Sequence, residues 1–119
     1  MSQSFSPGDF LIFQLESGYG LIRILAIEGV DSARVWHVSV YDELFPDVEP
    51  AEKALEHIES LHVSKPHLAL TERAFERTPA ARLGNAPLHD SDLVPYHEWQ
   101  QTLERRVVDR SLLLLLGMR

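Results

Sequence analysis

The chain contains no cysteine, so disulfides, thiolate metal sites and cysteine nucleophiles are all excluded. Its apolar runs are also short, and the longest, residues 112–116, is about a quarter of the roughly 20 residues that a membrane-spanning helix needs. The first ten residues lack the basic start and apolar stretch of a secretion signal. We therefore expect a cytoplasmic protein that has no membrane partner and is stabilised by packing alone.

Positive charge is scarce as well. Eleven Lys and Arg residues stand against 18 Asp and Glu residues, which gives a formal net charge of −7. Neutralising a phosphate backbone requires clustered Lys and Arg, so we expect no nucleic-acid partner. The simplest role of such a charge is to keep a cytosolic domain soluble.

The remaining composition fits one globular domain. The 119 residues are 45% hydrophobic, which is enough for one core but not for two. No internal repeat or long linker divides them. We take residues 1–119 as a single domain.

Two apolar runs, residues 10–15 and 20–27, flank a turn at residues 16–19 and predict a β-hairpin. Gly18 can supply the positive φ of a short loop, and Gly20 allows a bulge or a close approach. The G-x-G of this turn has Arg23 where a dinucleotide-binding motif has its third glycine, and a strand rather than a helix follows. We therefore predict no nucleotide or other cofactor here.

Alternation predicts a third strand over residues 33–41, with Trp36, Val38 and Val40 on the core face. Its other face carries Val35, His37, Ser39 and Tyr41. From Val48 the apolar period becomes helical, through Ala51, Leu55 and Ile58 with Ala54 and Leu61 beside them, after an N-cap at Asp47.

Later residues predict shorter elements. Residues 67–71 and 74–78 resemble strands, residues 83–92 a loop, and a helix begins near Asp92 with Pro95 in its first turn and Tyr96, Trp99 and Leu103 on one face. Ser111 caps a short apolar segment that Gly117 ends, and its leucines fit a helix or a strand. The fold class is α+β: a strongly bent antiparallel sheet, in the form of an SH3-like partial barrel, with one or two packed helices.

No metal site or catalytic residue is predicted. His57, His62 and His67 recur every five residues, which suits neither a helix face nor a strand face. The segment from His89 to Asp92 lacks the glycine and the closing glutamate of a calcium loop, so Asp90 or Asp92 is better explained as a helix cap. Without a nucleophile elbow or an oxyanion hole, we expect no enzyme.

The most unusual feature is an acidic segment, residues 42–59, in which seven carboxylates and an aromatic residue accompany a single lysine. A negative patch around an aromatic anchor suits a basic protein partner, because complementary fields speed encounter. A solvated helix face, with Phe45 anchored in the core, is the simpler explanation. The residues predicted to bind a partner are Asp42, Glu43, Phe45, Asp47, Glu49, Glu52 and Glu56.

Basic residues are concentrated later in the chain. They could pair with the acidic segment within one molecule or between two copies, so a homodimer competes with a foreign partner. These residues are Arg73, Arg77, Arg82, Arg105, Arg106, Arg110 and Arg119.

Several short motifs together resemble a known family. They are an opening P-G-D before an apolar strand, a G-Y-G turn, a late G-N-A-P and a Tyr–Trp pair. This order is similar to the bacterial immunity proteins of the twenty-sixth polymorphic-toxin immunity family, and the acidic segment has no match in that pattern. The resemblance implies a non-catalytic protein that neutralises a toxin domain, often a nuclease. The matching positions are Pro7, Gly8, Asp9, Gly18, Tyr19, Gly20, Gly84, Asn85, Pro87 and Trp99.

Two other functions stay open. An SH3-like or Tudor-like module would bind a peptide in a groove walled by Tyr19, Trp36 and Tyr41. A small hydrolase would need His37 or His97 to converge with carboxylates in a pocket.

Overall fold

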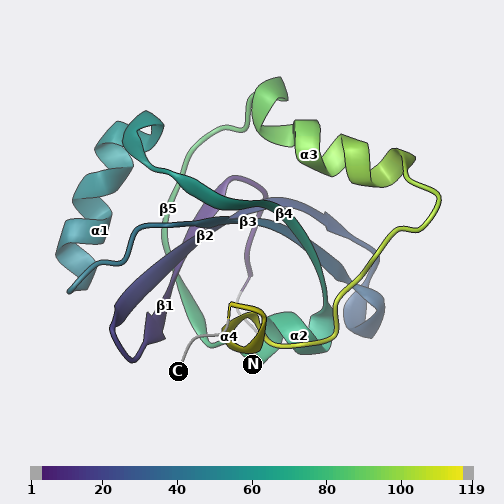
Figure 1. Ribbon diagram of the computed structural model, residues 1–119, viewed down its shortest axis with the longest axis horizontal. Coiled ribbons are helices and arrows are strands. Elements are labelled where there is room, and N and C mark those ends of the chain that lie inside the picture. The colour runs from purple at the N-terminus through teal and green to yellow at the C-terminus, as the bar shows by residue number, and fades with distance from the viewer. Residues whose placement is uncertain (1–3, 117–119) are drawn as a thin grey trace.

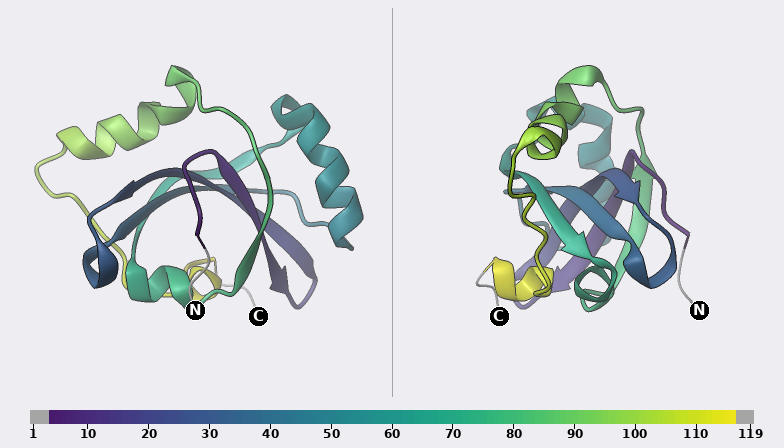
Figure 2. Two further views of the ribbon diagram at one scale, coloured as in Figure 1. Left: turned by 180° about the vertical axis from the view of Figure 1, so that it is seen from behind. Right: turned by 90° about the vertical axis from the view of Figure 1, so that its right-hand side faces the viewer.

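A computed structural model describes residues 4–116 of the chain, which form an α+β fold (Figure 1). Five strands build one antiparallel sheet, and helices lie on both of its faces (Figures 1 and 2). The strands are β1 (Asp9–Leu15), β2 (Gly18–Glu28), β3 (Val35–Tyr41), β4 (Val63–Thr71) and β5 (Ala80–Asn85). The α-helices are α1 (Val48–Ala54), α2 (Glu72–Glu76), α3 (Asp90–Gln101) and α4 (Leu112–Leu115), and the 3-10 helices are η1 (Asp31–Ala33) and η2 (Leu55–Ser60).

The sheet has the strand order β4-β3-β2-β1-β5. The expected α+β class and antiparallel sheet are therefore confirmed. The strand order describes an open sheet with β4 and β5 as its edges, so the SH3-like partial barrel is not confirmed. None of the helices within residues 4–116 is long and apolar enough to cross a membrane.

The predicted hairpin is confirmed as β1 and β2, which pair from Phe10 with Arg23 to Leu15 with Gly18. Gly18 has a φ of 147°, and a Cβ there would lie 2.7 Å from the Phe45 carbonyl oxygen. Gly20 allows the ring of Phe13 to lie against the backbone, since a Cβ there would lie 2.5 Å from that ring. The two glycines thus serve the turn and its packing.

Replacing Gly20 by alanine should lower the free energy of unfolding by about 1 to 3 kcal/mol, because the buried Phe13 ring has to move. Urea unfolding of the variant measures the effect. Ser17→Ala, at an exposed position of the same turn, is the control and should stay within about 0.5 kcal/mol of the parent. Equal stabilities of the two variants would refute the close approach.

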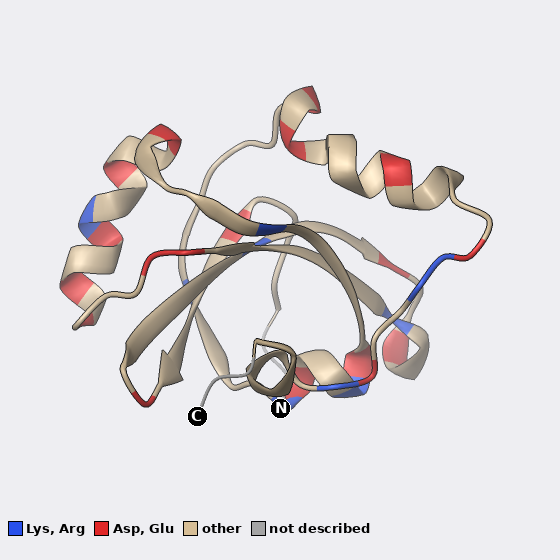
Figure 3. Cartoon of the chain, in the orientation of Figure 1, with Lys and Arg blue, Asp and Glu red and all other residues tan. Residues whose placement is uncertain are grey.

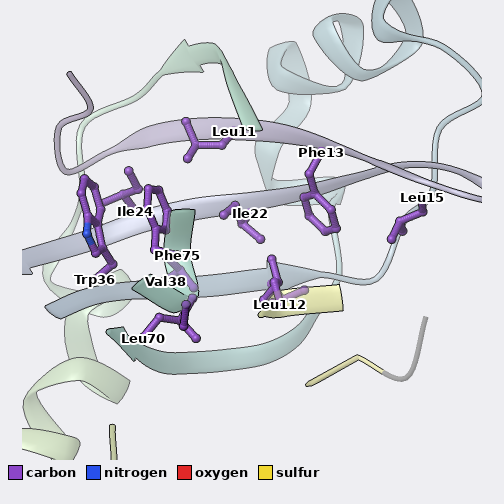
Figure 4. Packing of buried hydrophobic residues seen from close by; sticks show 12 residues of the cluster. Leu11, Phe13, Leu15, Ile22, Ile24, Trp36, Val38, Leu70, Phe75 and Leu112 are labelled. Atoms are coloured by element: carbon purple, nitrogen blue, oxygen red, sulfur yellow. The ribbon is translucent and has the colours of Figure 1, made fainter. Parts of the chain in front are cut away.

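The inner face of the sheet holds the larger core, which includes Trp36 and Val38 (Figure 4). Trp36, Val38 and Val40 are all buried, as predicted. α2 and α4 cover this face (Figure 2). Phe75 of α2 stacks on Trp36 with ring centroids 4.0 Å apart, and Leu112 of α4 is almost wholly buried.

The outer face is covered by α1, η2 and α3 (Figure 1). A smaller core of Phe10, Leu21 and Tyr41 lies here and packs against the apolar side of η2. The face of β3 that carries His37, Ser39 and Tyr41 was predicted to lie outside the core, but all three residues are buried. The polar side chains of β3 are buried against other parts of the chain, because helices cover both faces of the sheet.

Several later elements differ from the prediction. Residues 74–78, predicted as a strand, lie largely in α2, because Thr71 caps that helix by accepting a hydrogen bond from the Ala74 N–H at 3.1 Å. Residues 83–85, predicted as loop, belong to β5, which pairs with β1. The third strand begins at Val35, after the single turn of η1.

The helices follow the prediction more closely. Asp47 caps α1 by accepting from the Val48 N–H at 2.8 Å, and the helix changes to η2 with a kink at His57. α3 begins before Asp92, so Pro95 lies in its second turn, and Leu103 lies beyond its end and is fully exposed. The leucine segment is a helix capped by Ser111, and Gly117, its predicted end, lies outside the described residues.

Candidate functional site

The acidic segment lies at one end of the outer face, on the loop after β3 and on α1 and η2 (Figure 3). Its side chains are mostly exposed. The exposed members of the predicted site are Asp42, Asp47, Glu49, Glu52 and Glu56. These five carboxylates are therefore all exposed on the loop after β3 and on α1 and η2, and we call this set the acidic surface.

Phe45 and Glu43, the other two predicted residues, have structural contacts. Phe45 forms a β-bridge with Tyr19 through hydrogen bonds of 2.8 and 2.9 Å, and its ring packs against the outer core. Glu43 lies 2.7 Å from His62 Nδ1 and accepts two hydrogen bonds of 3.0 Å from the His62 N–H. Burial tends to raise the pKa of the Glu43 carboxyl, but these hydrogen bonds outweigh it and hold that pKa below its usual value.

The basic residues do not neutralise the acidic surface within the described part of the chain. Arg73 pairs with Asp109, and Arg82 lies 3.9 Å from Asp9. Across residues 4–116, the ion pairs of the acidic segment are formed with histidines alone: Glu43 pairs with His62, and Glu59 pairs with His57. Arg119 lies outside the described residues. The negative field of this surface therefore reaches solvent.

A second polar cluster lies between the sheet and α3. His37 is wholly buried, with Nε2 at 2.7 Å from Glu28 Oε1 and Nδ1 at 2.9 Å from His67 Nε2. A carboxylate can only accept, so Nε2–H of a neutral His37 donates to Glu28. His37 Nδ1 is then the acceptor for the Nε2–H of a neutral His67. Tyr96 donates to the other Glu28 oxygen at 3.0 Å, and Trp99 packs on His37 with a centroid separation of 4.6 Å. We call these five residues the histidine cluster.

The histidine cluster shifts the proton affinity of its members. Burial lowers the pKa of His37, although the Glu28 carboxylate opposes this, and burial together with nearby His37 lowers the pKa of His67 to about 4. Burial and the hydrogen bond to Glu28 raise the pKa of Tyr96 to about 12. Burial also tends to raise the pKa of Glu28, but the hydrogen bonds from His37 and Tyr96 bring it below its usual value. The network is therefore built around neutral histidines and an ionised carboxylate.

This geometry bears on the two alternative functions. Trp36 and Tyr41 are buried on opposite faces of the sheet, so they do not wall a common peptide groove with Tyr19. His37 does meet a carboxylate, but its ring is fully enclosed and contacts no solvent. His97 is exposed and bonds to Gln100 on its own helix at 3.1 Å. The arrangement around His37 fastens α3 to the sheet.

Among the described residues, no group of three or more histidine, aspartate or glutamate side chains is placed to hold a metal ion. His57 and His62 are exposed, whereas His67 belongs to the histidine cluster. His89 occupies the N-cap of α3, and Asp92 accepts from its N–H at 2.8 Å. The predicted cap at Asp90 or Asp92 is therefore wrong in position: His89 is the N-cap, and Asp92 bonds back to it from the third position of the helix.

Two of the motifs that carry the family resemblance meet in space. Asn85 of β5 donates to the buried Asp9 carboxylate at 2.7 Å and to the Pro7 carbonyl at 3.3 Å. The Gly8 carbonyl accepts from the Ala86 N–H at 3.1 Å. The P-G-D and G-N-A motifs therefore hold the first and last strands together. Comparisons with protein-family models, curated proteins and solved structures gave no match to this chain.

Proposed function

We propose that the chain is a non-catalytic binding protein that neutralises a basic partner, as an immunity-like inhibitor of a toxin domain. The observation that supports this proposal is the acidic surface. Its five exposed carboxylates lack Lys or Arg ion pairs within residues 4–116. A basic toxin surface built to hold phosphate would be attracted to such a field and covered by it.

The α1–η2 unit is suited to present these charges. Ala51 of α1 is fully buried, and Leu55 and Ile58 pack on the outer core, so one side of the unit is fixed to the sheet. Glu49, Glu52 and Glu56 remain exposed. A surface held in this way loses little conformational freedom on binding, which favours affinity.

The SH3-like partial barrel also remains a proposal. It is supported by the strand order, in which β1 pairs with both β2 and β5, and by the short helix α2 between β4 and β5. In this arrangement the acidic surface lies outside the barrel, on the elements inserted between β3 and β4. The insertion would carry the binding function, and the barrel would be its scaffold.

Reversing three charges, with Glu49→Lys, Glu52→Lys and Glu56→Lys in one variant, should weaken partner binding about tenfold or more. The probe is the purified product of a toxin gene adjacent to the gene for this chain, and calorimetry at several salt concentrations measures Kd. The parent should bind more weakly as salt increases, because screening reduces the attraction.

The matched control reverses three exposed glutamates elsewhere, with Glu76→Lys, Glu98→Lys and Glu104→Lys, and alters the net charge equally. It should bind within about threefold of the parent, since its charges lie outside the acidic surface. If both triple variants weaken binding equally, only net charge matters and the surface is wrongly assigned. If the parent sediments as a dimer that the first variant disrupts, the surface serves self-association instead.

A further inference from the structure

A cleft of about 190 Å³ lies on the outer face between β4 and the first half of α3. Arg23, Ser39 and Tyr41 reach it from the sheet. Asp92 and Pro95 reach it from α3. It is separate from the acidic surface and from the histidine cluster, so neither the proposed function nor the fastening of α3 accounts for it.

Arg23 is 4% exposed, and its guanidinium is incompletely paired. Nη2 donates to the carbonyls of Ala86 and Pro87 at 3.0 and 3.1 Å. Nε is buried and has no hydrogen-bond partner within residues 4–116. Nη1 lies 3.6 Å from Asp92 Oδ2, which is an ion-pair distance but longer than a hydrogen bond. A buried cation with unused donors favours an anionic acceptor.

Two hydroxyl groups lie beside this guanidinium. Ser39 pairs with Arg23 across β2 and β3, and both side chains line the cleft. Burial raises the pKa of Tyr41, and its neighbours Arg23 and Ser39 act against that rise. Both hydroxyls are therefore protonated near neutral pH and can donate to an anion held by Arg23.

The other walls limit what the cleft can take. Leu25, Val63, Pro66 and Pro95 contribute apolar surface. The volume is smaller than the roughly 300–1,000 Å³ of pockets for drug-sized ligands. Asp92 adds a negative charge at the rim, which opposes a dianion more than a monoanion. Size, apolar walls and charge together favour one carboxylate on a short aliphatic group.

We propose that this cleft binds a small aliphatic monocarboxylate, whose oxygens accept hydrogen bonds from Arg23, Ser39 and Tyr41. Arg23 supplies the positive charge, and Nη1 is the donor that remains for the carboxylate, because Nη2 already donates to two backbone carbonyls. The hydroxyls complete the donor set, and the short aliphatic group lies against the proline and valine walls. Asp92 competes for Nη1 and so limits the affinity.

Titration of the full chain with sodium propionate tests this proposal, with the Arg23 Nε–Hε NMR signal as the readout. A saturable shift with a Kd on the order of millimolar is expected, since few ligand atoms are in contact. Propionamide has the same shape without the charge and should produce no saturable shift. Inorganic phosphate, largely dianionic at pH 7.5, should bind more weakly than propionate.

Single substitutions measure how much each hydrogen-bond donor contributes to propionate binding. Arg23→Lys keeps the charge but loses the Nη1 donor and the bonds of Nη2 that hold the guanidinium in place, and it should weaken binding about tenfold, whereas Arg82→Lys, at an exposed arginine, should not. Tyr41→Phe and Ser39→Ala should each weaken it about threefold to tenfold. Asp92→Asn should strengthen binding, because the competing charge is removed.

Three results would overturn the proposal: no saturation with propionate, an equal shift with propionamide or sodium chloride, or tighter binding of phosphate. If Arg23→Lys fails to fold, unchanged binding by both Tyr41→Phe and Ser39→Ala is equally decisive against it. The Glu49, Glu52 and Glu56 reversal should leave propionate binding unchanged. The propionate titration therefore tests the cleft proposal independently of the proposed function of the acidic surface.

Discussion

Replacing His37 by alanine should lower the free energy of unfolding by about 3 kcal/mol or more, measured by urea denaturation at pH 8. The ring is fully buried and has polar contacts at both nitrogens, with Glu28 and with His67. The variant loses both contacts and leaves a cavity beneath Tyr96 and Trp99, whose rings lie 4.6 Å from it. The cavity and the unsatisfied polar partners both destabilise the folded state.

His97→Ala is the matched control, because His97 is exposed on α3 and, within residues 4–116, its side chain bonds to nearby Gln100. It should change the free energy of unfolding by no more than about 0.5 kcal/mol. Amide hydrogen exchange of α3 adds a local readout, and it should accelerate in His37→Ala but not in His97→Ala. Similar behaviour of the two variants would refute the idea that the histidine cluster fastens α3.

Local sequence signals predicted the first half of the fold well. The hairpin follows from two apolar runs around Gly18, and the core face of β3 follows from the alternation of Trp36, Val38 and Val40. Asp47 was identified as a cap because a short acceptor before a helical period satisfies a free N–H group. Each of these signals acts within a few residues.

The errors arise where tertiary contacts decide the structure. Residues 74–78 have strand-like composition, but the Thr71 cap and the stacking of Phe75 on Trp36 stabilise a helix there. Residues 83–85 are rich in turn-formers, and pairing with β1 makes them part of a strand. The Thr71 cap is a local signal, three residues from Ala74, that the strand prediction overlooked. The stacking on Trp36 and the pairing with β1 leave no local signal, because the partner residues lie far away in the chain.

The acidic surface was visible in the sequence as a run of charges, and the structure places its carboxylates on one exposed unit. The histidine cluster was not predicted, because Glu28, His37 and His67 come from three different strands. His37 had been noted on a face of β3 that was expected to lie outside the core. One signal for the cluster was present, since Tyr96 and Trp99 share a helix face that needs a partner.

Lowering the pH from 6.5 to 4.5 should reduce the free energy of unfolding by up to about 3 kcal/mol. Burial and nearby His37 lower the pKa of His67 from 6.5 to about 4, and burial lowers that of His37. These two rings therefore bind protons near pH 6.5 in the unfolded chain but stay neutral in the folded chain, so stability falls as the pH falls through this window. Urea unfolding at half-unit pH intervals measures the slope.

His67→Gln should flatten this pH profile, because it removes the group with the large shift and leaves the exposed histidines in place. Glu28 and Glu43 act in the same direction, because hydrogen bonds hold their pKa values below the usual carboxyl value, but most of their contribution is lost below this pH window and both remain in the parent and in His67→Gln. Equal slopes for the parent and His67→Gln between pH 6.5 and 4.5 would mean that His67 is protonated in the folded state. In that case the neutral histidine network between the sheet and α3 would be wrong.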